Sequence, residues 1–170
     1  MSNPRTLRCY DYVPIPYVKV REALRRDAVA IFQRATQSAA TRAGEVSASL
    51  RAGVGPFEVG VDATIAIRNV TDEISALGDS TTRIELTWSA ARRAGLFPSM
   101  TAVLSLYPLS AGETQLDLDG EYRPPLGALG NALDALIGHR LAEAASLRFL
   151  RDVSVYLTRE LADPAAAQGS

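Results

Sequence analysis

Few residues in this sequence could act in nucleophilic or metal chemistry. The chain has one cysteine, Cys9, and one histidine, His139. A single cysteine excludes an internal disulfide and a cysteine-rich zinc module, and a single histidine excludes every site that needs two. We interpret Cys9 as a small, half-buried apolar residue of a first strand. We interpret His139 as a surface or rim histidine, which could orient a ligand carbonyl or act as a general acid.

The acidic and glycine motifs do not indicate a metal or a cofactor. Asp117, Asp119 and Gly120 have the spacing of the start of a calcium loop, but Ala128 stands where an EF-hand needs its bidentate glutamate. Asp117, Asp119 and Glu121 alternate with apolar residues, so we expect all three to face solvent. The glycine spacing fits neither a dinucleotide-binding loop nor a P-loop. We therefore predict no metal site, no cofactor and no visible catalytic constellation.

Length and charge limit the class of protein. The chain has 170 residues, of which 18 are basic and 19 acidic, and 47% are hydrophobic. This predicts a single folded domain over residues 1–164, followed by a disordered tail at 165–170. The charge balance argues against nucleic acid as a partner. We read no secretory signal and no membrane span, so we expect a cytoplasmic protein without stable membrane insertion. Arg92 and Arg93 are expected in a solvated loop, with contact to a membrane surface as the alternative.

The first third of the chain predicts a strand and two short helices. Thr6–Val13 has the composition of a strand, and Pro14 ends it because proline lacks a ladder donor. The pattern becomes helical from Tyr17. Asp27 is placed to cap a second helix whose apolar residues recur at helical spacing, and Gly44 is its expected end.

The middle of the chain alternates apolar and polar residues with the period of a β-strand. Such alternation is typical of antiparallel strands with one dry face. We expect five consecutive strands joined by short turns, within residues 46–52, 59–68, 83–88, 100–107 and 114–123. With the first strand this makes six, and a short strand near Val70 to Ile74 would supply a seventh. Inward polar groups are then few, namely Thr82 and Thr114.

The last long element is a helix that starts at Gly127 or Leu129 and ends at Leu161. Its length is about 50 Å at 1.5 Å per residue, enough to cover the dry face of the sheet. Its N-terminal half carries a second apolar stripe, formed by Leu129, Leu133, Leu136, Ile137 and Leu141. This stripe could pack against the short helices, contact a ligand, or meet another subunit.

The order of these elements, and one junction, resemble a known superfamily. The junction GEYRPPLGALGNALD at residues 120–134 is similar to the step from last strand to C-terminal helix in the START (SRPBCC) superfamily, and in particular in its bacterial polyketide cyclase-like members. Phe149–Val153 lies where such proteins carry the back half of this helix. The resemblance implies an α+β helix-grip fold, in which a curved antiparallel sheet of six to seven strands surrounds the long C-terminal helix, with two short helices after the first strand.

The resemblance also implies an apolar cavity between sheet and helix, and therefore binding or carrying of a hydrophobic small molecule such as a lipid or polyketide. The alternatives are a polyketide cyclase or dehydratase, using His139 with Arg140 or using Tyr122, and a homodimeric interaction module. Monomer and homodimer both remain open. The residues expected to contact a ligand are Val61, Ile65, Ile84, Leu86, Trp88, Leu104, Leu106, Leu118, Tyr122, Leu133, Leu136, Ile137 and Arg140.

Overall fold

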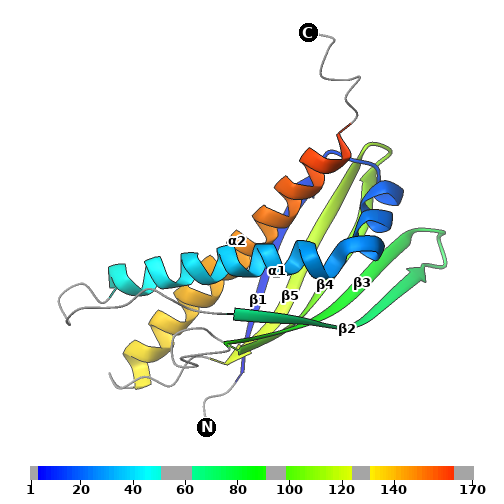
Figure 1. Cartoon of the computed structure of the whole chain (residues 1–170). Coiled ribbons are helices and arrows are strands. Elements are labelled where there is room, and N and C mark those ends of the chain that lie inside the picture. The colour runs from blue at the N-terminus through cyan, green and yellow to red at the C-terminus, as the bar shows by residue number, and fades with distance from the viewer. Residues whose placement is uncertain (1–3, 51–62, 91–98, 124–130, 163–170) are drawn as a thin grey trace.

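A computed structural model describes residues 4–50, 63–90, 99–123 and 131–162 of the chain (Figure 1). The elements in chain order are β1 (Arg5–Val13), α1 (Tyr17–Leu50), β2 (Ala63–Ile74), β3 (Ser80–Ala90), β4 (Ser99–Ser110), β5 (Glu113–Arg123) and α2 (Asn131–Leu161). Four predicted features lie outside the described residues, namely the turn between the strands expected at 46–52 and 59–68, the loop with Arg92 and Arg93, the start of the C-terminal helix before Asn131 and the tail at 165–170.

The described strands form one antiparallel sheet with the order β1-β5-β4-β3-β2. Its five strands are fewer than the six to seven expected. Val70 to Ile74 is not a separate strand but the second half of β2, which continues past an irregularity between Ile67 and Asn69. A short turn joins β2 to β3, as expected for consecutive strands, and Gly78 provides the positive φ of 87° that this turn requires.

The strand predicted at residues 46–52 is wrong over its described part. Residues 46–50 form the end of α1, and the helix passes through Gly44, which does not end it. The segment Val46–Leu50 alternates over only five residues, and its Ala and Ser neighbours are tolerated in a helix. Val46 and Leu50 are also four residues apart, which is a helical spacing, so the local pattern fits both structures.

The two short helices predicted after the first strand are joined into one long, kinked helix. Asp27 has non-helical dihedral angles, with φ −131° and ψ 19°, inside α1. The expected boundary at Asp27 is therefore present as a kink rather than as a gap. Beyond the kink the buried positions are Ala28, Ile31, Phe32, Ala35 and Ala39, which confirms the predicted helical face.

Both helices help to form the core on the inner face of the sheet. α2 contacts β1 and β5, while α1 contacts β2, β4 and β5 and crosses α2 (Figure 1). From Ala142 onwards, α2 buries Ala142, Ala145, Phe149, Val153 and Leu157 against this layer. Thr82 and Thr114 are buried as expected, and each makes a hydrogen bond: Thr82 with Tyr17 at 2.7 Å, and Thr114 with the Ile15 carbonyl at 2.8 Å.

Candidate functional site

One row of inward side chains crosses the sheet near the end of its described part. In the strand register Tyr122 lies opposite Met100, Met100 opposite Trp88, and Trp88 opposite Ile65. Trp88, Met100 and Tyr122 are buried, and Ile65, on the edge strand β2, is partly buried. We call these four residues the end row. It combines two aromatic rings that carry polar atoms with a flexible methionine between them, a combination suited to contact with an organic ring system.

The interior next to the end row, towards the C-terminal half of α2, is filled by aromatic rings. The fully buried ring of Phe149 stands edge-on to Trp88, with ring centroids 4.6 Å apart, and its centroid is 5.7 Å from that of Phe32. A Cβ at Gly120 would lie 3.0 Å from the Met100 sulfur and 3.1 Å from the Ala102 Cβ, so side chains of the neighbouring strand β4 occupy the space beside this glycine. The interior on this side of the end row is therefore filled by side chains.

A polar pair joins the end row to the N-terminal half of α2. The Tyr122 hydroxyl lies 2.8 Å from Nδ1 of the partly exposed His139. Arg5 is the cross-strand partner of Tyr122. Burial raises the pKa of Tyr122 above its ordinary value, although the positive charge of Arg5 acts to lower it. Tyr122 therefore stays protonated at neutral pH and can donate a hydrogen bond.

The residues predicted to contact a ligand fall into three groups. The inner face of the sheet buries most of them, namely Ile84, Leu86, Trp88, Leu104, Leu106, Leu118 and Tyr122, with Ile65 partly buried at the edge. Leu133, Leu136 and Ile137 belong to the N-terminal half of α2, where the structure describes the backbone and not these side chains. Val61 lies outside the described residues.

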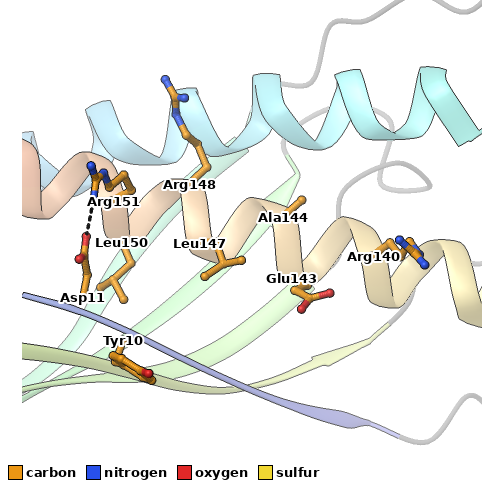
Figure 2. A pocket seen from close by; sticks show the side chains of 9 residues that line it. All are labelled: Tyr10, Asp11, Arg140, Glu143, Ala144, Leu147, Arg148, Leu150 and Arg151. Carbon is orange, nitrogen blue, oxygen red and sulfur yellow. Dashed lines mark ion pairs between the residues drawn. The ribbon is translucent and has the colours of Figure 1, made fainter.

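Arg140, the remaining predicted residue, is exposed and lines a groove of about 590 Å³ where α2 passes over the edge strand β1. Figure 2 shows the residues that line this groove, with Asp11 on β1 pointing towards α2, where it forms an ion pair with Arg151, and Tyr10 pointing to the other side of β1. Two further grooves lie along the outer face of the sheet and between the α1 kink and β2. None of these three grooves is lined by a residue of the end row.

The expectation that Asp117 faces solvent with Asp119 and Glu121 is wrong for Asp117. Its side chain is on the outer face of the sheet, but the residue is only 7% exposed. Arg8 on the neighbouring strand covers it, with Nε 3.2 Å from the carboxylate, and the Tyr107 hydroxyl donates a second hydrogen bond at 3.3 Å. Asp119 and Glu121 are exposed, as predicted.

Cys9 is more deeply buried than expected, with 6% of its surface exposed. Burial raises the pKa of its thiol to about 12, and the charges of Asp117 and Asp11 act in the same direction. The thiolate is the nucleophilic form, so this environment suppresses nucleophilic chemistry at Cys9. Within the described ranges no three His, Cys, Asp or Glu side chains are grouped to hold a metal ion. No helix in the described part of the chain is long and apolar enough to cross a membrane.

Sequence reasoning missed two participants in this site, Met100 and Arg5. Met100 was identified only as one of several alternating strand residues, and its place between Trp88 and Tyr122 depends on the register of three strands. Arg5 lies 117 residues before Tyr122 in the sequence, and only the β1–β5 pairing brings them together. A pattern within one segment has no signal for such a pairing.

The likeness of the chain to known proteins lies in its structure. No family model matches the chain, and no curated protein sequence matches it. A solved structure of the Zhui aromatase/cyclase from Streptomyces sp. R1128 is similar over 99% of this chain and 100% of the other, with a TM-score of 0.52 at 14% identity. The protein TTHA0849 from Thermus thermophilus is similar over 92% of this chain and 99% of the other, with a TM-score of 0.51 at 12% identity. With its five-stranded antiparallel sheet and long C-terminal helix, the described part of the protein has the α+β helix-grip fold.

Proposed function

We propose that the protein binds a hydrophobic small molecule between the end row and the N-terminal half of α2. The observation that carries this proposal is the end row itself: Trp88, Met100 and Tyr122 lie side by side on the inner face. Apolar and aromatic linings with a few placed polar groups are typical of small-molecule sites. The Tyr122–His139 pair supplies such a polar group at one end.

The proposed ligand contacts are assigned by how far each residue lies along its strand from the end row. Leu86 extends the apolar surface beside the end row, while Leu133, Leu136 and Ile137 are proposed to cover the ligand from α2, with Val61 at the rim. The other predicted residues, Ile84, Leu104, Leu106 and Leu118, lie further along the sheet and are proposed to support the wall. Arg140 lines the outer groove, so we propose that it acts at most at the mouth of the site.

The likeness to a solved aromatase/cyclase supports a small-molecule ligand. Aromatisation and cyclisation are reactions of organic molecules, and the two chains share a fold. A fold alone does not define a function, so the argument for this chain rests on its own end row.

Fluorescence titration of Trp88 tests the proposal, because it is the only tryptophan in the chain. The probe is anthrone, a flat tricyclic ketone. We expect a saturable change in Trp88 emission with one equivalent bound. Ile65→Glu places a charge at the accessible end of the end row and should abolish binding, because an uncompensated charge in an apolar site is costly.

Leu147→Glu is the matched control, since it adds the same charge in the outer groove, where Leu147 is about half exposed. It should leave anthrone binding unchanged. Loss of binding in Leu147→Glu but not in Ile65→Glu would place the ligand in the outer groove and contradict the proposal. The absence of saturable binding would contradict it as well.

The Tyr122–His139 hydrogen bond favours a second candidate, an enzyme of the cyclase or dehydratase kind. Such chemistry needs a positioned proton donor or acceptor beside an apolar substrate, and this pair provides one. Incubation of the protein with an aromatic polyketide precursor, followed by mass spectrometry, would show loss of water if the enzyme is a dehydratase. Conversion that persists in His139→Phe and in Tyr122→Phe would exclude this pair as its source.

A further inference from the structure

The edge strand β1 has one side without a partner strand in the described part of the chain. β1 lies at one end of the strand order and pairs there with β5 alone. The backbone N–H of Tyr12 donates to the Asp11 carboxylate at 2.9 Å, which places this N–H on the free edge. Every second residue of a strand directs its backbone groups to the same side, so Thr6, Arg8 and Tyr10 share this edge. The edge therefore offers a row of donors and acceptors to a further strand.

This edge lacks the features that usually prevent the addition of another strand. Exposed edges are commonly protected by proline, by lysine, or by charged side chains that project over the backbone. β1 has nine residues, RTLRCYDYV, and contains neither proline nor lysine. Arg8 is held by an ion pair to β5, and Asp11 by a hydrogen bond from α2. Tyr10 and Tyr12, by contrast, are 61% and 42% exposed.

The helix α2 carries a charge pattern beside this edge that is complementary to itself. Glu143, Leu147 and Arg151 line the groove between α2 and β1, and they follow one another at intervals of four residues, which places them on one face of the helix. In an antiparallel pair of such helices with Leu147 opposite its own copy, Glu143 of each chain lies opposite Arg151 of the other. A twofold interface requires this kind of pattern, because each of its contacts occurs twice.

We propose that this face binds a second copy of the chain, in a twofold dimer that joins the two sheets through antiparallel β1 strands. Pairing Tyr10 with its own copy places Arg8 opposite Tyr12 of the second copy, where the guanidinium can stack on the ring. A twofold axis through the Tyr10 pair, perpendicular to the sheet, also makes the two α2 helices antiparallel. Tyr10 and Leu147 line the same groove, so a single axis serves both layers. The inference does not depend on the proposed ligand site.

The matched charges favour a second copy over an unrelated peptide as the occupant of this edge. A peptide that adds a strand gains its affinity from backbone hydrogen bonds and leaves the charges on α2 unused. A second copy uses the strand edge and the helix charges together. Because this face combines a half-exposed leucine with charged residues, we expect a dimer that dissociates on dilution, with a Kd on the order of 10 μM.

Sedimentation velocity of the full chain at increasing concentration tests the dimer. A wild-type protein that stays monomeric at about 100 μM would overturn the inference. Glu143→Arg and Arg151→Glu each place like charges opposite one another, so each should raise the Kd roughly 10- to 100-fold. Glu160→Arg is the matched control, since Glu160 is exposed and lies 13 residues after Leu147, on the opposite face of α2. A dimer that neither charge reversal weakens would overturn the inference.

An equimolar mixture of Glu143→Arg and Arg151→Glu separates lost pairing from lost folding. In the mixed pair, one of the two contacts is the native one and the other has its charges exchanged, so both contacts join opposite charges. The mixture should therefore form a heterodimer at concentrations where each variant alone is monomeric. A mixture that is no more dimeric than its separate components would overturn the inference.

Amide hydrogen exchange at Tyr10 tests the pairing of the strands. The Tyr10 N–H should exchange more slowly as the wild-type protein dimerises, and Glu143→Arg at the same concentration should lose this protection. A dimer without protection at Tyr10 would overturn the inference. Protection of Tyr10 in a monomeric protein would assign the edge to another occupant, such as a copurified peptide, and would overturn it as well.

Discussion

Replacing Phe149 by alanine should lower the free energy of unfolding by about 4 kcal/mol. The Phe149 side chain is fully buried and packs against the rings of Trp88 and Phe32, with centroids 4.6 Å and 5.7 Å away. Truncation of a buried phenylalanine costs about 3–5 kcal/mol, which includes the lost transfer energy and the cavity left behind. Contact with two further rings places Phe149 in the upper part of that range, since an aromatic pair adds about 0.5–1.5 kcal/mol.

Urea unfolding followed by Trp88 fluorescence measures this cost, and the m-value shows whether the transition stays two-state. Phe149→Leu keeps most of the volume and should cost roughly 1 kcal/mol, so it remains informative if the alanine variant is too unstable. Leu147→Ala, about half exposed on the same helix, should cost less than about 1 kcal/mol. If Phe149→Ala costs no more than Leu147→Ala, the interior is not filled by these rings, and the site cannot be restricted to the N-terminal half of α2.

Three further predictions concern the free energy of unfolding. Burial raises the pKa of Cys9 from about 9 to about 12, so as pH rises the thiol loses its proton in the unfolded state before it does so in the folded state. The free energy of unfolding of the wild type should therefore fall relative to that of Cys9→Ala above pH 9, by about 2 kcal/mol at pH 10.5 in urea titrations. A difference between the two proteins that stays constant with pH would contradict this. Thr82→Val removes the hydrogen bonds to Tyr17 and Asp72 and should cost about 1–3 kcal/mol in thermal or urea unfolding, whereas a neutral effect would show that the buried Tyr17 hydroxyl finds another partner. Gly120→Val should cost about 1–3 kcal/mol by crowding its strand neighbours, and increased stability in the same assay would show that they yield freely.

The strands that could be predicted from sequence are those whose two faces differ in burial. Ile84, Leu86 and Trp88 alternate with polar residues, and all three are buried on the inner face of β3. When only one face of a strand is buried, apolar and polar residues alternate with a period of two, so the sequence pattern predicts both the strand and its buried face. The strand prediction is wrong for residues 46–50 because the small residues of this segment are also tolerated in a helix, and these residues form the end of α1.

The parts that could not be predicted depend on contacts between distant segments. Alternation assigned Asp117 to the outer face correctly but not to its buried position, because Arg8 covers it from another strand. The polar pair illustrates the same limit. His139 was predicted to be a surface or rim histidine, but its hydrogen bond to Tyr122 depends on β5 lying against α2.

Methyl NMR of Met100 tests the central claim most directly. The chain has two methionines, Met1 and Met100, so selective ¹³C-methyl labelling gives two assignable signals. With saturating anthrone, we predict a shifted Met100 methyl and intermolecular NOEs from it to the aromatic protons of the probe, while the Met1 signal stays unchanged. Saturable binding of anthrone without any NOE or shift at Met100 would contradict the claim that the ligand lies against the end row.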